Sequence, residues 1–290
     1  MPPPKRSLGQ HFLTDPGVCS KIVRAARYGP EDIVLEIGPG KGALTEKLLD
    51  TVLQVIAVEL DSQLVDALAK RLALEPMTAT GPIRRILRGR NMVLVESDIG
   101  EVKLGELPGR PEPQKKLRVV GNLPYNQATA ILQRLLEQTP EIEDFTLMFQ
   151  REVAERMLAP PGDRTYGFLS VIVQFHCRIQ KLFNVAPGAF YPRPKVQSTM
   201  LHLKPIEPGR LPAEQRARFL RLVSASFLAK RKTLLNNLRA VFPAMAPTSI
   251  AEQCAAVQID AHRRAETLTV EEFIALALQL TPVRGTPAAR

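Results

Sequence analysis

Residues 33–44 read IVLEIGPGKGAL, and the chain changes character in the middle of this stretch. The first five residues are almost all apolar, which predicts a strand buried on both faces. Gly38, Gly40 and Gly42 then predict a turn, after which apolar residues recur at helical spacing over 43–49. Glycines between a strand and a helix let a ligand approach the backbone, and the helix N-terminus favours a negative group. The stretch therefore predicts a nucleoside-cofactor site, against the plainer interpretation of a mere tight turn.

The alternation of strands and helices continues along the chain. Further strands are predicted at 54–58, 92–96, 117–120 and 144–149, and further helices at 16–27, 62–74 and 128–138. Such alternation is typical of a parallel sheet covered by helices. Two strand-like runs between residues 167 and 203 flank Pro187–Pro194, and they predict an antiparallel edge that makes the sheet mixed.

Two segments rich in proline and basic residues, 75–90 and 107–116, interrupt this rhythm and are expected to be exposed loops. After residue 205 the pattern changes, because only helical periodicity continues to about residue 280. We therefore expect an α/β fold with a Rossmann-like catalytic domain over residues 1–205, built on a mixed, mostly parallel sheet. A small all-α domain is expected over residues 206–290.

Composition limits the classes of function. The chain has 290 residues and a net charge of +10, so its surface attracts phosphate, although an ordinary basic enzyme would look the same. No apolar run approaches the ~18 residues that a membrane span needs, and we expect no membrane contact. The three cysteines lie far apart, which argues against a disulfide framework or a metal site. The cytoplasm is the expected location.

Acidic residues at the ends of the predicted strands narrow the choice of cofactor. Glu59 ends the second strand, where a carboxylate can accept both hydroxyls of a ribose. The glycine pattern also fits a dinucleotide fingerprint, so it does not by itself separate NAD from S-adenosylmethionine. Glu36 can pair with the ammonium of a methionine moiety, and Asp98 can accept from an adenine amine. Together these residues predict a Rossmann-like domain that depends on S-adenosylmethionine.

The fourth strand ends in Asn122-Leu123-Pro124-Tyr125, which suits methylation of an exocyclic adenine amine and has no role in hydride transfer. The lone pair of that amine is delocalised into the ring, so acceptors for its hydrogens help the nitrogen become tetrahedral. The Asn122 side-chain oxygen and a carbonyl of Leu123 or Pro124 can serve as acceptors. Tyr125 offers a ring on which an extruded base can stack. Positioning and electrostatics then supply most of the rate.

At this point the sequence strongly resembles the ribosomal RNA adenine N6-dimethyltransferases. The matching segments span most of the chain and are LGQHFL (8–13), EIGPGKGALT (36–45), VELD (58–61), NLPYN (122–126), FQREVAER (149–156) and FYPRPKVQS (190–198). The resemblance implies that His11, Leu13, Gly38, Glu59, Asp98 and Asn122 contact the cofactor or frame its pocket. It also implies that Phe190 stacks on the target adenine opposite Tyr125. His11 stands where many members have asparagine.

The resemblance is closer to one of the family's two main branches. That branch dimethylates two neighbouring adenosines near the 3′ end of small-subunit (16S) rRNA, and Leu123 and the basic residues Lys230, Arg231 and Lys232 favour it. These three, with Arg221, are expected to bind rRNA within a pre-30S particle, and the enzyme is expected to be a monomer. The alternatives are large-subunit (23S) rRNA methylation, which confers macrolide resistance, and a non-catalytic RNA-binding assembly factor.

Overall fold

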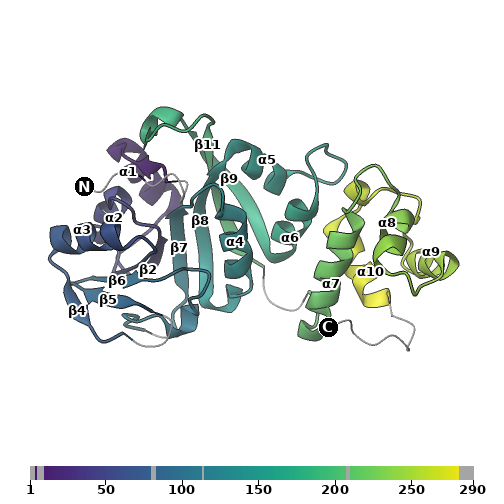
Figure 1. Cartoon of the computed structure of the whole chain (residues 1–290), viewed down its shortest axis with the longest axis horizontal. Helices are drawn as coiled ribbons and strands as arrows, with labels where there is room; N and C mark the ends of the chain where they lie inside the picture. Colours follow the sequence, from purple (N-terminus) through teal and green to yellow (C-terminus); the bar gives the residue numbers. More distant parts are fainter. Residues whose placement is uncertain (1–3, 5–9, 80–82, 113, 207–209, 281–290) are drawn as a thin grey trace. The chain divides into compact units, whose positions relative to one another are not determined.

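The computed structural model describes residue 4 and residues 10–79, 83–112, 114–206 and 210–280. The chain forms two compact units, one of residues 1–154 and 178–205 and the other of residues 155–177 and 206–290 (Figure 1). The change of unit between residues 205 and 206 lies where the sequence pattern changes. Residues 155–177, which sequence analysis assigned to the catalytic domain, group by their contacts with the helical unit.

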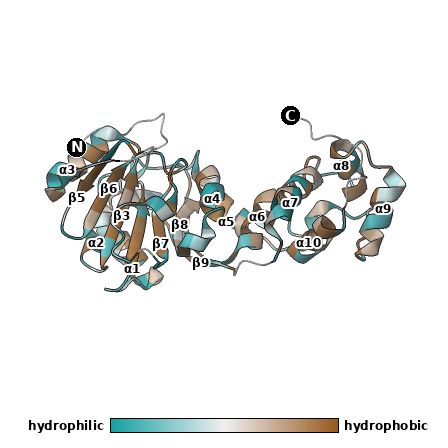
Figure 2. Cartoon of the chain, turned by 90° about the horizontal axis from the view of Figure 1, so that it is seen from below, coloured by the Kyte–Doolittle hydropathy of each residue, from teal (hydrophilic) through white to brown (hydrophobic). Residues whose placement is uncertain are grey.

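The first unit is built on a nine-stranded sheet in the order β4-β5-β6-β3-β2-β7-β8-β11-β9. Its five central strands run parallel to one another: β6 (Met92–Glu96), β3 (Gln54–Glu59), β2 (Ile33–Ile37), β7 (Leu117–Asn122) and β8 (Ile142–Gln150). Every residue of β2 and β6 is buried, which explains why both strands read as nearly continuous apolar runs. Figure 2 shows these strands as mostly hydrophobic ribbons. The predicted mixed, mostly parallel sheet is confirmed.

Antiparallel strands extend the sheet at both edges. On one side lie β5 (Arg85–Arg88) and β4 (Glu75–Met77). On the other lies β11 (Ser198–Pro205), antiparallel to β8, with β9 (Cys177–Val185) beside it. The expectation of a plain loop over 75–90 is therefore wrong, because Ile86 and Leu87 are buried within the hairpin that the segment forms. The described part of 107–116 contains no helix or strand, as expected.

Helices α1 (Pro16–Ala26), α2 (Ala43–Leu49) and α3 (Ser62–Leu72) cover one face of the sheet. The first two pack on Val55 of β3 and the third on Ala57, and these side chains share a face because they lie two residues apart. Two more helices, α4 (Ala128–Leu136) and α5 (Arg151–Leu158), follow β7 and β8. Asp15 caps α1 by accepting from the backbone amides of Gly17 and Val18.

In its described residues the second unit consists of helices and their connecting loops, apart from Cys177, which begins β9. It contains α6 (Phe168–His176), α7 (Ala213–Ser226), α8 (Leu234–Val241), α9 (Pro247–Ala256) and α10 (Val270–Gln279). Its core includes the stacked rings of Phe175 and Phe219, with ring centroids 4.3 Å apart. The strand-like interpretation of residues 168–176 is wrong, because a short apolar run on a buried helix cannot be told from a buried strand by its periodicity. No helix in the described parts of the chain combines the length and the apolar character needed to cross a bilayer.

Candidate active site

A cavity of about 1120 Å³, its open mouth included, lies at the carboxyl ends of the parallel strands in the first unit. This is the edge where ligands bind in open α/β sheets. It brings together nearly all the residues predicted to hold a cofactor or to catalyse: His11, Leu13, Glu36, Gly38, Gly40, Glu59, Asp98, Asn122, Leu123, Pro124 and Tyr125. Residues from segments more than a hundred positions apart therefore line one space.

The glycine turn between β2 and α2 forms one wall of the cavity. Gly38 donates its backbone N–H to the carbonyl of Val58 at 2.9 Å, which fixes the turn to the end of β3. Gly40 has a φ of +54°, and a Cβ added there would lie 2.9 Å from the ring of Phe12. Glycine is therefore required at this position for both its backbone conformation and the space it leaves.

Glu59 is buried at the end of β3 and is held by backbone amides. Its Oε1 accepts from the N–H groups of Leu60 and Asp61 at 2.9 Å each, and its Oε2 accepts from Gly40 at 3.1 Å. Burial raises the pKa of Glu59 above its ordinary value, although these three amides act in the opposite direction. The carboxylate is thus fixed in orientation and still has lone pairs for further donors.

Glu36, on β2, is a second buried carboxylate facing the cavity. Its Oε2 accepts from the hydroxyl of Thr45 at 2.7 Å. Burial raises the pKa of Glu36 to about 7, and the nearby charge of Glu59 adds to this effect. A cation bound beside Glu36 would favour its ionised form, which is the behaviour expected of a residue that receives an ammonium group.

Asp98 follows β6 and completes the set of acidic residues. Its Oδ1 accepts from the N–H of Gly100 at 2.8 Å, so the backbone orients this carboxylate too. The neighbouring Ser97 and Ile99 also line the cavity. The Ser97 hydroxyl is buried without a hydrogen-bond partner in the described structure, and sequence analysis assigned it no role of its own.

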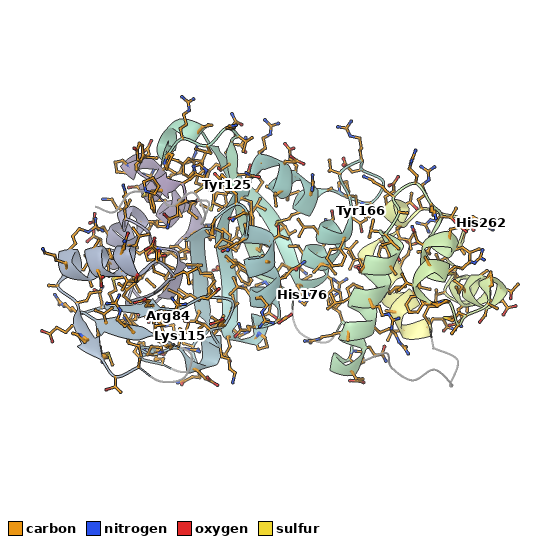
Figure 3. The ribbon with its side chains drawn as sticks, viewed as in Figure 1. Arg84, Lys115, Tyr125, Tyr166, His176 and His262 are labelled. Atoms are coloured by element: carbon orange, nitrogen blue, oxygen red, sulfur yellow. The ribbon has the colours of Figure 1, made fainter. Side chains whose placement is uncertain are left out.

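The tetrapeptide that ends β7 presents an acceptor and a ring to the cavity. The side-chain amide of Asn122 donates from Nδ2 to the carbonyl of His11 at 2.7 Å, which leaves Oδ1 available as an acceptor. Tyr125 shares a hydrogen bond of 2.5 Å with the hydroxyl of Ser198, and its ring is stacked with that of His11 at 5.4 Å. Figure 3 shows Tyr125 beside the end of the central strands. Asn122 and Tyr125 both line the cavity, and their roles as acceptor and stacking surface stay predictions.

A short N-terminal strand joins two of the predicted motifs. Strand β1 (Phe12–Leu13) pairs antiparallel with β10 (Phe190–Tyr191) to form a separate two-stranded sheet. His11 donates from Nδ1 to the carbonyl of Pro192 at 2.6 Å, while its own carbonyl accepts from Asn122. These contacts bring the segments around residues 11, 122 and 190 together in space. Leu8 and Gly9, which begin the first motif, lie outside the described residues.

Comparison with known proteins identifies the family. The family model for ribosomal RNA adenine dimethylase matches residues 3–281. The chain belongs to this family. Two similar relatives bear the name ribosomal RNA small subunit methyltransferase A. The protein from Acidithiobacillus ferrooxidans is 39% identical over 277 residues, covering 96% of this chain and 94% of that protein. The protein from Pseudomonas syringae pv. syringae is 41% identical over 273 residues, with 94% and 93% covered.

Two solved structures resemble this member of the ribosomal RNA adenine dimethylase family along most of its length. A dimethyladenosine transferase from Plasmodium falciparum has a TM-score of 0.71 and 29% identity, with 92% of this chain and 96% of that one covered. The 23S rRNA methyltransferase ErmE has a TM-score of 0.64 at 24% identity, with 93% and 99% covered. The second likeness concerns the fold alone, so it carries no argument about the substrate.

Phe190 is the predicted catalytic residue that the structure does not bring to the cavity. Phe190 is only 4% exposed, and its side chain belongs to an apolar cluster with Leu13 and Val185. The next residue, Tyr191, is 59% exposed. Stacking of Phe190 on a base remains a prediction for this family member, and it would require the ring to leave its core position.

The basic residues predicted to bind RNA lie in the helical unit. Lys230, Arg231 and Lys232 are exposed in the segment before α8, and Lys230 donates to the carbonyl of Arg164 at 2.5 Å. Arg221, on α7, donates to the carbonyl of Val241 at 3.4 Å and lies over the ring of Phe242. Arg231 and Lys232 make no ion pair within the described structure, so their charges are available to phosphate.

Proposed function

We propose that the cavity binds S-adenosylmethionine, which supplies an electrophilic methyl group when it is bound. Glu59 would hold the ribose hydroxyls, Asp98 the adenine amine and Glu36 the ammonium of the methionine moiety. The support is the set of three oriented acidic residues at successive strand ends, together with a glycine turn that leaves room for a nucleoside. His11 and Leu13 would close the pocket from the N-terminal strand.

We further propose that the chain dimethylates N6 of two adjacent adenosines near the 3′ end of small-subunit rRNA during ribosome assembly. The observation that carries this proposal is the free Oδ1 of Asn122, held in place by the bond from Nδ2 to His11. The names of relatives that match over nearly the whole chain supply the choice of the small-subunit RNA.

Each residue of the tetrapeptide then has a defined task. Asn122 Oδ1 and a carbonyl of Leu123 or Pro124 accept the two amine hydrogens, which favours the tetrahedral nitrogen that attacks the methyl group. Tyr125 stacks on the extruded adenine and sets its plane. No strong base is needed, because the nitrogen becomes acidic once it is methylated. A monomethylated amine still has one hydrogen to donate, so the same site can act twice on each adenosine.

The helical unit would dock the enzyme on folded RNA within a pre-30S particle, as a monomer in the cytoplasm. Phosphate contacts by Lys230, Arg231, Lys232 and Arg221 would position the substrate without reading its sequence. Replacing Lys230, Arg231 and Lys232 together with alanine should weaken RNA binding and reduce its salt slope by up to about three. Cofactor affinity should not change. A salt slope that is unaffected would remove this segment from the interface.

The decisive experiment measures where methyl groups go. Small and large ribosomal subunits that lack the modification are incubated separately with the enzyme and labelled S-adenosylmethionine, and their nucleosides are analysed by mass spectrometry. We expect N6,N6-dimethyladenosine in small-subunit RNA at two positions. Label in large-subunit RNA alone would favour the macrolide-resistance activity, and no label would favour an assembly factor without catalysis. In the same assay, Phe190→Leu with full activity would assign that ring to packing.

A further inference from the structure

Tyr191 lies in an unusual position for an aromatic side chain. It is 59% exposed, and it is the only aromatic residue among the large hydrophobic residues that are exposed in the described structure. Its backbone is not loose, because Tyr191 is the direct partner of Phe12 in the pairing of β10 with β1. Phe12 lines the cavity, whereas Tyr191 does not. The ring is therefore held at the edge of the cavity with its surface in solvent.

A cation accompanies the two rings. The ammonium of Lys41 lies 5.0 Å from the ring centroid of Phe12 and 5.5 Å from that of Tyr191. Lys41 belongs to the glycine turn and lines the cavity. In the described parts of the chain it has no carboxylate within ion-pair distance, so its charge is available to an anion as well as to the rings. An aromatic surface and an unpaired cation thus occupy the same rim.

The segment that carries Tyr191 adds further positive charge. Arg193 and Lys195 are exposed, and no ion pair holds either of them within the described structure. Val196 is exposed as well, at 45%. Exposed aromatic rings interleaved with cations are the surface that binds single-stranded nucleic acid, because bases stack on the rings while phosphates approach the cations. Core packing does not account for a ring with most of its surface in water.

We propose that Tyr191 and Lys41 form a second nucleotide subsite at the rim of the methyl-transfer cavity. The base of a nucleotide adjacent to the target adenosine stacks on Tyr191, and its phosphate contacts Lys41. The subsite holds the flanking strand while the target base enters the cavity, so it acts on substrate binding and positioning. This inference rests on the proposed function, since it takes the substrate to be RNA with an extruded adenosine.

The test compares two substitutions at one position. Unmethylated small ribosomal subunits are titrated at saturating S-adenosylmethionine, and KM and kcat are measured for wild type, Tyr191→Leu and Tyr191→Phe. Losing a base stack should raise KM by roughly tenfold or more in Tyr191→Leu, while Tyr191→Phe should stay within about twofold of wild type. The affinity for S-adenosylmethionine, measured by calorimetry, should be equal in all three. Leu53→Ser, which changes an exposed apolar residue that does not line the cavity, should leave KM unchanged.

Lys41→Gln gives a second, independent readout. The salt slope of binding to the same subunits should decrease by about one, which is the change expected for one lost phosphate contact. If the wild type is active and Tyr191→Leu has an unchanged KM, the proposed subsite is wrong. The proposed function is then unaffected. Equal losses in Tyr191→Leu and Tyr191→Phe, or a parallel loss of cofactor affinity, would also overturn the subsite. A wild type that methylates no subunit would instead refute the proposed function.

Discussion

Buried carboxylates lie at both ends of the parallel strands, but those that face the cavity at the carboxyl end have no cation beside them. At the amino end, Arg118 of β7 donates to Asp144 at 2.6 Å and to Asp32 at 2.8 Å, and its guanidinium lies 4.7 Å from the ring of Tyr28. At the carboxyl end, the described partners of Glu36 and Glu59 are a hydroxyl and backbone amides, with no cation among them.

This difference appears directly in the acid–base behaviour of the groups. Burial alone would raise the pKa of Asp144, but hydrogen bonds from His202 and Arg118 lower it below its ordinary value. Burial raises the pKa of Glu36 to about 7 because no cation opposes it. The surroundings of Asp144 at the amino end therefore favour the charged carboxylate, whereas those of Glu36 beside the cavity disfavour it.

The comparison separates residues that hold the fold together from residues kept ready for a ligand. Arg118 also donates to the carbonyls of Ala26 and Arg27, so it closes the end of α1 as well as pairing acids. A buried carboxylate without a cation is costly, and a folded chain retains one chiefly where a ligand completes it. We therefore expect substitutions at the amino end to change stability and those at the carboxyl end to change binding and turnover.

The largest effect on stability should come from removing Arg118, which pairs with the carboxylates at the amino ends of the strands. Arg118→Met leaves Asp144 and Asp32 without their cation, so the free energy of unfolding should fall by about 3–5 kcal/mol. Urea denaturation followed by circular dichroism measures this. Arg134→Met is the matched control, because Arg134 pairs with Glu137 on the surface and its loss should cost about 1 kcal/mol or less. Equal costs for the two variants would contradict the structural role of the buried network.

The contrast also explains how much the sequence predicts. The residues that meet at the cavity could be predicted almost one by one, because glycines, acids and Asn122 lie in or directly after apolar strands and each has a local signal. Their roles stay predictions. The amino end could not be predicted in this way, since Arg118, Asp144 and Asp32 are ordinary charged residues whose partners are set by strand order. The same limit applies to Phe190, whose burial depends on its pairing with Leu13 across the chain.

Two segments were mispredicted for a different reason. Residues 85–88 place Ile86 and Leu87 between arginines, and too few residues are present to show an alternating pattern. Residues 168–176 are apolar on nearly every side because α6 is buried, so helical periodicity is hidden. Arg110 lies in a segment correctly expected to be a loop, yet its side chain is 5% exposed and pairs with Glu141 at 2.8 Å. In each case tertiary packing supplies information that local patterns lack.

The second prediction concerns turnover at the carboxyl ends of the strands, where the cavity lies. Asn122→Ala removes the acceptor that we assign to the target amine, and kcat should fall by roughly 10²–10³. The free energy of unfolding should change far less than in Arg118→Met. Asn126→Ala is the control, since Asn126 is exposed and does not line the cavity. Single-turnover methylation of small subunits gives the rate, and a near-normal rate in Asn122→Ala would exclude the residue from the mechanism.

The third prediction concerns cofactor binding. Glu59→Ala removes the acceptor proposed for the ribose hydroxyls, so S-adenosylmethionine should bind more weakly by about 1–3 kcal/mol. Calorimetry of the purified protein measures this without RNA. Glu46→Ala, which removes an exposed acid on α2, should bind as wild type does. If both variants kept full affinity, the cofactor pocket would have to lie elsewhere.

The smallest effect is a pH dependence whose sign differs between the two ends. The pKa of Glu36 is 4.5 when exposed and about 7 when folded, so the folded protein holds the extra proton between these values. Its contribution to stability is therefore greatest below pH 4.5 and decreases as the pH rises toward 7. For Asp144 the sign is opposite, because its lowered pKa gives stability that is present above 3.8 and lost as the pH falls through the folded value.

The same proton links pH to cofactor binding. Only ionised Glu36 can pair with an ammonium group, so affinity for S-adenosylmethionine should rise between about pH 5.5 and 7, where an α-amino group remains charged. The rise should approach, but not exceed, about tenfold per pH unit, since one proton is released. Glu36→Gln should bind weakly with no slope in this range, whereas Glu46→Gln should retain the slope. Calorimetry in two buffers of different ionisation enthalpy would count the released proton. A slope that persists in Glu36→Gln would assign the released proton to another group. Glu36 would then not be the carboxylate that receives the ammonium group.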